Sequence, residues 1–562
     1  MLLKDYKVKI PENRVRIQKK DNYYYVYLKD EYIYKQDKKY SIEKRVCIGR
    51  KIDDEYMIPN ERYSLYFDDL QFKLSEPGEF SDTLKIGSIV LFDKILKDIE
   101  LEEILNVHEE KKDTLVNIAS YMLIEGSSAL QYYPGFAYDH NIRGRIFSDS
   151  FLSRYLDSFK DEEIENFLNA WNALYGSGSG IYINCDGTNM NSSAQGIQLL
   201  EYGHSKKEVD LKQVNISFAS LAEDATPLFY EVYPGSIIDN SELALLALKA
   251  GRYGYEHIGF ILDRGYCSKK NIGFLDDSGY SFIMMVRDSN TFLKAFKQEI
   301  STLVSGDDLD LFIDQYNLFG KTFKAKLYPD DKKERYIHVY YDEEKAAEER
   351  SMIRSNIARI KAVLDAALES EDIRLRHRSK YEGFSKLVNL HYEGEYLKSY
   401  SLKKSVINRM LKDCGYFALI SSKKYDAAEI LSIYRSRDSI EKLYMALKTH
   451  LDLDTLRVHT DSKLKAKLHI GFIASIIRNE IYKKSKELKI EYKDRKNYTV
   501  PAMIKELEKI ECSKTVNNIY ELRYALTARQ KKILKLFDID EKYLRSEVKK
   551  INKNMEEIFS EK

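Results

Sequence analysis

The stretch IYINCD, residues 181–186, is a nearly uninterrupted apolar run that ends on an acidic side chain. The glycines of GSGSG at 176–180 break the preceding helical pattern, and a short apolar run with such a boundary predicts a buried β-strand. A lone carboxylate is costly to bury. Asp186 therefore either has a chemical use at this strand end or caps the turn that follows at Gly187-Thr188.

The segments that follow residue 186 predict a mixed α/β sheet. Apolar strand patterns alternate with amphipathic helical patterns, in the order β-β-β-α-β-α-β counted from residue 181. Three consecutive strands followed by alternation indicate a mixed sheet with helices packed on it. The further strands are expected at 213–220, 227–235, 257–263 and 280–287, and the helices at 241–251 and 268–279.

An interruption at 288–414 separates this region from one more strand at 415–422 and a long helix at 427–451. Within it, residues 321–342 predict a hairpin and residues 343–368 a long helix. One face of that helix is apolar, which indicates either core packing or a seam for a partner. Its apolar residues are Ile353, Ile357, Ile360, Leu364 and Leu368.

The N-terminal region has a marked charge pattern. Residues 1–50 hold 14 Lys and Arg against 7 Asp and Glu, whereas residues 51–110 hold 6 against 16. Alternation at 22–34 and 40–49 predicts an antiparallel hairpin, and its basic, Tyr-rich surface suits DNA as well as it suits plain solvent exposure. Residues 90–175 predict helices, the last two of which are either a DNA-reading pair or simply packed together.

The composition excludes several classes of protein. The chain has 562 residues, 44% hydrophobic and 32% charged, with a net charge of +1, so it is globular and not a polycation. Five scattered cysteines without a CxxC pair argue against a disulfide framework and a structural zinc site. GSGSG precedes a strand, whereas a dinucleotide fingerprint follows one, so no nucleotide cofactor is expected. No apolar run approaches the ~18 residues of a membrane span, and we expect a cytoplasmic protein.

A second acidic side chain occupies an equivalent position. Asp263 ends the apolar stretch FILD and is followed by Arg264-Gly265-Tyr266. Two carboxylates at the ends of neighbouring strands repel each other unless a cation lies between them. Hard cations such as Mg²⁺ take oxygen ligands and tolerate this arrangement. The alternative is that each acid merely caps its own turn.

The helix at 427–451 adds a polar face to a largely apolar sequence. Tyr434, Arg437, Glu441 and Lys448 are spaced by 3, 4 and 7 residues, which places them on one side of a regular helix. An exposed, ion-paired helix face explains part of this pattern on its own.

Three stretches together resemble the DDE transposases of bacterial insertion sequences, of the IS-four type with a Y-R-E-K signature. They are INCDGTNMN (183–191), FILDRGY (260–266) and YRSRDSIEKLYMALK (434–448). All four signature positions are filled, and the resemblance covers residues 176–483. It implies a ribonuclease-H-like mixed sheet with flanking helices, interrupted by a β-rich insertion domain.

The resemblance also implies the chemistry. Asp186, Asp263 and Glu441 would bind two divalent ions, Mg²⁺ or Mn²⁺, and two such ions assist phosphodiester hydrolysis. The exposed 3′-OH would then join target DNA, or first attack the opposite strand to form a hairpin. Tyr434, Arg437 and Lys448 would contact DNA phosphates near the cleaved end. The partners would be the terminal inverted repeats and target DNA, with the protein a homodimer on the DNA ends and associated with the nucleoid.

The expected organisation has four parts. Residues 1–175 would bind DNA ends, 176–287 with 415–483 would form the catalytic core, 288–414 the insertion domain and 484–562 a helical tail. The single tryptophan, Trp171, precedes the core, so a base-stacking role in the insertion would fall to a tyrosine: Tyr328, Tyr336, Tyr340 or Tyr341. Two other functions stay open: a nuclease of the same fold without strand transfer, and a non-catalytic DNA-binding protein.

Overall fold

The structure is a computed structural model in which the chain forms two compact units, Met1–Phe80 and Ser81–Lys562. Each unit is described by itself. Side chains of a few residues within the described strands and helices, Asp186 among them, lie outside the description. The residues described are 7–35, 40–60, 62–63, 66–67, 81–140, 147–175, 182–203, 211–237, 239–255, 258–286, 293–304, 309–331, 333–492, 498–515 and 519–560.

The first unit is an antiparallel sheet with strand order β1-β5-β4-β3-β2. The strands are β1 (Val8–Lys9), β2 (Val15–Lys20), β3 (Tyr23–Lys35), β4 (Tyr40–Lys51) and β5 (Tyr56–Pro59). Strands β3 and β4 pair from Tyr25↔Arg50 to Lys35↔Tyr40, which confirms the predicted hairpin. Val26, Leu28 and Ile48 are buried on one face and form this unit's own core with Met57.

A nine-stranded mixed sheet forms the centre of the second unit, in the order β12-β13-β14-β17-β11-β10-β7-β8-β9. Strand β10 runs parallel to both β7 and β11, while the remaining pairs are antiparallel. The predicted order of strands and helices is confirmed from residue 182 to residue 286. The elements are β7 (Tyr182–Asn191), β8 (Gln213–Leu221), β9 (Pro227–Pro234), α7 (Asp239–Arg252), β10 (Gly259–Leu262), α8 (Lys269–Asp277) and β11 (Ser281–Met285).

The segment 288–414, which interrupts the predicted core in sequence, is only partly separate from the central sheet. Strands β13 (Leu318–Ala325) and β14 (Arg335–Tyr341) form the predicted hairpin. Strand β14 then pairs with β17 (Tyr416–Ser421) from Tyr336↔Ser421 to Tyr341↔Tyr416, so the hairpin extends the central sheet. The β12 strand (Phe312–Ile313) completes that edge. A sequence pattern shows that a hairpin forms but not which strand it joins.

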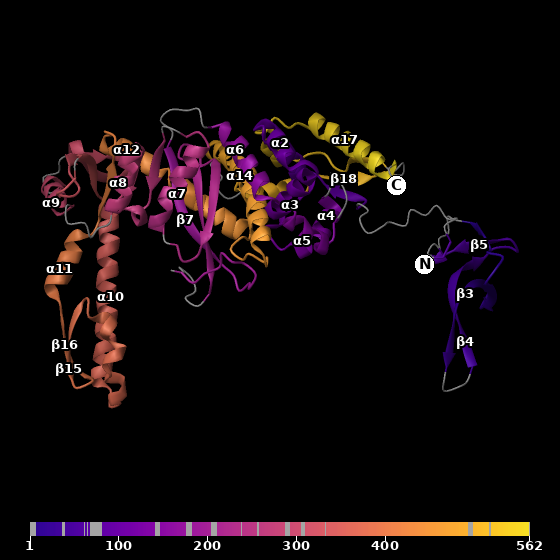
Figure 1. Ribbon diagram of the computed structural model, residues 1–562, viewed down its shortest axis with the longest axis horizontal. Coiled ribbons are helices and arrows are strands. Elements are labelled where there is room, and N and C mark those ends of the chain that lie inside the picture. Colours follow the sequence, from indigo (N-terminus) through magenta and orange to yellow (C-terminus); the bar gives the residue numbers. More distant parts are fainter. Residues whose placement is uncertain are drawn as a thin grey trace. The chain divides into compact units, whose positions relative to one another are not determined.

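Residues beyond β14 form a projection from the sheet. Helix α10 (Glu343–Glu369) runs away from it, and β15 (Val388–Glu393) and β16 (Tyr396–Leu402) lie along the helix (Figure 1). The apolar stripe of α10 is core here: Ile360 and Leu364 are buried in a cluster with residues of β15, β16 and α11 (Lys404–Asp413).

Helices cover the other end of the sheet. The long helix α14 (Asp461–Tyr492) packs against β9 on one side and against α3 (Lys112–Glu125) and α5 (Asp149–Asp157) on the other. Phe472 of α14 stacks near Phe218 of β8, with ring centroids 6.3 Å apart. The other helices of this part are α1 (Gly87–Asp98), α2 (Leu101–Ile104), α4 (Tyr133–His140) and α6 (Asp161–Ala173).

The tail folds with the helices that open the second unit. Strand β18 (Glu511–Lys514) pairs with β6 (Thr83–Lys85) and with β19 (Tyr520–Leu522). Helices α15 (Val500–Leu507), α16 (Ala528–Lys535) and α17 (Glu541–Ser560) complete the tail. Gly87 lies so close to the tail that a Cβ there would meet Leu507 O at 2.2 Å. Among the residues described, no helix has the length and apolar character needed to cross a membrane.

Candidate active site

Two of the predicted acids lie at one end of a pair of parallel strands. The register pairs Leu262 of β10 with Cys185 of β7, so Asp263 and Asp186 are the next residue on each strand. Strand β7 does not end at Asp186 as expected, because β8 continues to pair with it as far as Asn191. Asp186 therefore marks the end of the parallel pairing only. Its side chain lies outside the described residues.

Asp263 caps the turn that follows it and also faces the guanidinium of Arg437. Its carboxylate accepts a hydrogen bond from Arg264 N at 2.7 Å and so caps the short turn Arg264–Tyr266. Its other oxygen, Oδ2, lies 3.4 Å from Nη2 of Arg437. The side chain is 34% exposed, which leaves it accessible from outside the protein.

The helix that carries the third acid is not continuous. It divides into α12 (Ala427–Arg435), α13 (Asp438–Met445) and a π-helical segment (Ala446–His450). Asn184 of β7 donates a hydrogen bond to Ser436 O at 3.5 Å, which ties the α12–α13 junction to the central strand. Ser436 and Arg437 at the junction keep right-handed helical backbone angles, and Arg437 and Glu441 form an ion pair four residues apart.

Arg437 lies between two of the predicted acids. Its guanidinium is 3.4 Å from Asp263 Oδ2 and 3.3 Å from Glu441 Oε1, and its side chain is 14% exposed. Glu441 is 56% exposed. Two carboxylates from distant parts of the sequence thus approach the same cation. The ion pair expected along the helix, between Arg437 and Glu441, is present, and Arg437 pairs with Asp263 as well.

The two remaining signature residues have different environments. Lys448 donates a hydrogen bond from Nζ to Asn189 O at 2.8 Å and lies 3.9 Å from Asp454. Tyr434 is 7% exposed and packs in a core cluster with Ile261 and Leu431. Lys448 therefore borders β7 beyond Asp186, whereas Tyr434 supports the junction from within.

Of the four tyrosines expected to stack a base, Tyr340 is buried, whereas Tyr328, Tyr336 and Tyr341 are half-buried. Trp171 is fully buried and donates from Nε1 to Pro227 O at 2.8 Å. Tyr340 is also fully buried, stacks on Phe417 and donates to Ala427 O. Neither ring has a free face for a nucleotide base.

The carboxylates at this site are of the chemical type that binds divalent cations. Carboxylate oxygens are the ligands that Mg²⁺ and Mn²⁺ prefer, and Asp263 and Glu441 already converge on a positive group. Within the described side chains, which exclude that of Asp186, no group of three or more His, Cys, Asp or Glu residues is arranged to hold a metal ion.

Comparison with known proteins identifies the domain. The model of the transposase DDE domain matches residues 185–477, which is more than half of the chain and includes all three acids. No curated protein sequence matches. A structural comparison finds a piggyBac transposase synaptic complex with hairpin DNA, at 9% identity and a TM-score of 0.31. The alignment covers 72% of this chain and 64% of that one.

Proposed function

Because the chain belongs to the family of proteins with a transposase DDE domain, we propose that it cleaves and joins DNA as an IS-four type transposase. It would bind the terminal inverted repeats of an insertion sequence and hydrolyse a phosphodiester bond at each end. The released 3′-OH ends would then be transferred to target DNA. The observation that carries the proposal is the convergence of Asp263 and Glu441 on one cation beside Asp186.

Asp186, Asp263 and Glu441 would hold two divalent ions, Mg²⁺ or Mn²⁺. Such ions activate an attacking oxygen and stabilise a leaving one. The protein would supply these three carboxylates from two adjacent strands and a helix. It holds Asp263 in place through the Arg264 amide. Arg437 neutralises part of the acidic charge before any ion binds.

The basic residues would position the DNA end. Arg437 has the planar donor geometry that suits a phosphate, and Lys448 supplies a point charge beyond Asp186. Tyr434 was expected to contact DNA as well. At 7% exposure it is better placed to support Arg437 from the core than to touch a phosphate. The protein would act as a homodimer that holds both element ends.

A nuclease without strand transfer is the competing function, and the product separates the two. Duplexes taken from the DNA that flanks the gene would be incubated with the full chain, Mg²⁺ and a supercoiled target plasmid. Joined products, or hairpin ends that resolve into joined products, are expected. Nicks at both ends without any joining would support the nuclease. No cleavage of these ends, alongside equal binding to unrelated DNA, would contradict both and leave a non-catalytic binding protein.

A further inference from the structure

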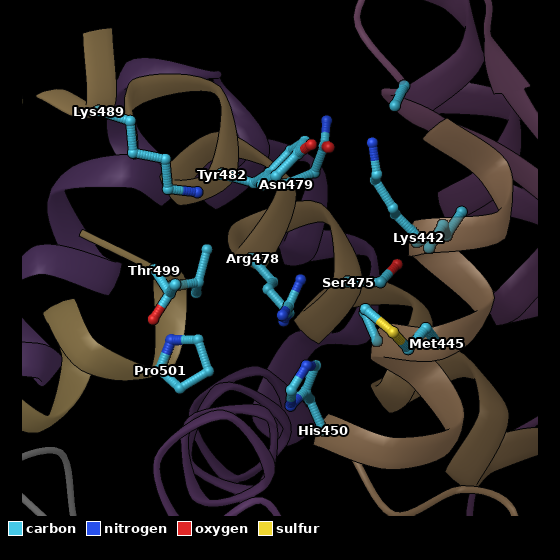
Figure 2. A pocket seen from close by; sticks show the side chains of 14 residues that line it. Lys442, Met445, His450, Ser475, Arg478, Asn479, Tyr482, Lys489, Thr499 and Pro501 are labelled. Carbon is cyan, nitrogen blue, oxygen red and sulfur yellow. The ribbon is translucent and has the colours of Figure 1, made fainter. Parts of the chain in front are cut away.

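A pocket of about 440 Å³ lies next to the helix that bears Glu441, and the acidic site does not use it. Its walls come from α13 and the π-helical segment, from α14, and from the first residues of α15 (Figure 2). All residues that line it belong to the second unit. The volume falls within the range of roughly 300–1,000 Å³ that is usual for small-ligand sites.

The pocket carries positive charge. Lys442, His450, Arg478 and Lys489 line it, and no acidic side chain is among the described lining residues. Figure 2 shows the Arg478 guanidinium in the space between His450 and Thr499. No carboxylate in the described part of the chain forms an ion pair with Arg478. Lys442 has one exposed acidic neighbour, Asp438, at 3.9 Å.

These cations are close enough to disfavour one another's charge. Burial lowers the pKa of Arg478 to about 10. Burial and then the charge of Arg478 lower the pKa of His450. Burial, followed by the charges of Lys486, Arg478 and Lys442, lowers the pKa of Lys489. An anion in the pocket would relieve this repulsion.

The rest of the lining is apolar and aromatic. Met445, Pro501 and the ring of Tyr482 border the pocket, and the ammonium groups of Lys486 and Lys489 lie 4.7 and 5.6 Å from the centroid of that ring. The start of α15, capped by Thr499, adds the positive end of a helix dipole. A phosphate alone would leave most of this space empty. A ligand with a phosphate at one end and a flat, partly apolar group at the other matches the lining.

We propose that this pocket binds a nucleotide, with its phosphate on Arg478 and its sugar and base against Tyr482 and Met445. The nucleotide is either the 5′-phosphorylated end of a DNA strand or a free mononucleotide. The first source rests on the proposed function. Because Lys442 and Met445 follow Glu441 within one turn of the same helix, an occupant also holds the part of α13 that presents this acid.

The test measures binding by the full chain in EDTA, where cleavage does not occur. The probes are inorganic phosphate, dTMP, decathymidylate with or without a 5′-phosphate, and polyglutamate. The variants are Arg478→Met, which removes the charge at similar volume, and Met445→Glu, which adds a negative charge at an exposed position and leaves the core unchanged. The matched control is Lys484→Met. Lys484 lies on α14, as Arg478 does, but outside the pocket, and it pairs with Glu487 at 3.3 Å.

Both pocket variants should weaken dTMP binding about tenfold or more, since each disturbs a charge-assisted contact, and Lys484→Met should change it less than about twofold. A loss confined to 5′-phosphorylated decathymidylate also supports the site and assigns it to a DNA strand end. The proposal is overturned if the unmodified chain binds none of the nucleotide probes, or if the control loses as much affinity as the pocket variants. Arg478-dependent binding of polyglutamate alone would also overturn it and assign the pocket to an acidic protein segment.

The same measurement separates this inference from the proposed function. Glu441→Gln should keep dTMP binding while it loses cleavage, because Glu441 does not line the pocket. If the unmodified chain cleaves DNA but binds no nucleotide, only the pocket assignment fails. If it binds dTMP through Arg478 but never cleaves DNA, only the proposed function fails.

Discussion

At the scale of single residues, the position of Arg437 matters most. Its guanidinium occupies the space between Asp263 and Glu441, where it stabilises two carboxylates that would otherwise repel each other. A bound divalent ion would compete for the same oxygens. Asp452, beyond the π-helical segment, already has partners: it lies 2.5 Å from Nη1 of Arg457 and accepts a hydrogen bond from Ser128 N.

The acids can be tested by nearly isosteric substitutions. Asp186→Asn, Asp263→Asn and Glu441→Gln should each lower DNA cleavage in Mg²⁺ by about 100-fold or more, because each removes one ligand charge. The melting temperature and DNA-end binding should change little, since Asp263 and Glu441 are partly exposed. Gel assays of end cleavage measure the effect.

Asp438→Asn is the matched control for this series. Asp438 lies on the same helix as Glu441, is 75% exposed and approaches only Lys442, at 3.9 Å. It should cleave at nearly the normal rate. Near-normal cleavage by Glu441→Gln together with loss in Asp438→Asn would contradict the assignment and make Asp438 the third ligand.

At the scale of elements, the contact between α4 and the end of α15 links the start of the second unit to the tail. His140 is 2% exposed, and its two ring nitrogens lie 2.8 Å from Asp139 and 2.6 Å from Glu508. Burial opposes protonation, but the hydrogen bonds to Asp139 and Glu508 outweigh it and raise the pKa of His140 to about 9. A protonated imidazole donates from both nitrogens, so the charged form holds the two elements together.

This contact predicts a pH-dependent stability. The folded-state pKa of about 9 exceeds the ordinary value of 6.5, so the contribution is complete below pH 6.5 and disappears as the pH rises through 9. His140→Gln should lower the free energy of unfolding by about 2–3 kcal/mol at pH 6, and the difference should shrink above pH 9. Thermal unfolding across this range measures it. His391→Gln, at an exposed position of β15, should show no such dependence, and a constant deficit in His140→Gln would refute the ionic account.

At the scale of the whole molecule, the first unit presents a surface of its own. In the register of β2, β3 and β4, Arg16, Lys20, Tyr25 and Arg50 point away from the core side marked by Val26. The guanidinium of Arg50 lies 4.5 Å from the centroid of Tyr23. Basic groups interleaved with tyrosines suit a DNA backbone, as the sequence pattern indicated.

We propose that this surface binds DNA, and the proposal predicts a change in salt dependence. The double substitution Arg16→Ala, Lys20→Ala in the full chain should weaken end binding and reduce the slope of log K against log salt by about 2, because each lost phosphate contact lowers it by about 1. Fluorescence anisotropy from low to moderate salt measures the slope. Lys531→Ala, at an exposed position of α16, should leave it unchanged. An unchanged slope in the double variant would place end binding elsewhere.

The sequence by itself determined the features that depend on neighbouring residues. The hairpin of β3 and β4, the order of elements from β7 to β11 and the existence of an apolar stripe on α10 follow from local periodicity, because the spacing of apolar residues sets which face is apolar. The position of Asp263 directly after β10 and the spacing of Arg437 and Glu441 were also legible, since a motif is a local pattern, whereas the continuation of β7 past Asp186 was not.

Only the tertiary structure decided which distant segments meet. The pairing of β14 with β17 and of β6 with β18 joins segments far apart in sequence, and no local pattern encodes such a partner. Asn184 of β7 donates a hydrogen bond to Ser436 O between α12 and α13, and Arg437 of that junction lies between Asp263 and Glu441, three segments that are distant in the sequence. Arg478 illustrates the same limit: it is one basic residue in an apolar helix until α13 and α15 close a pocket around it. The physical reason is that long-range contacts form only when the packed elements exclude water together, which a single stretch of chain does not reveal.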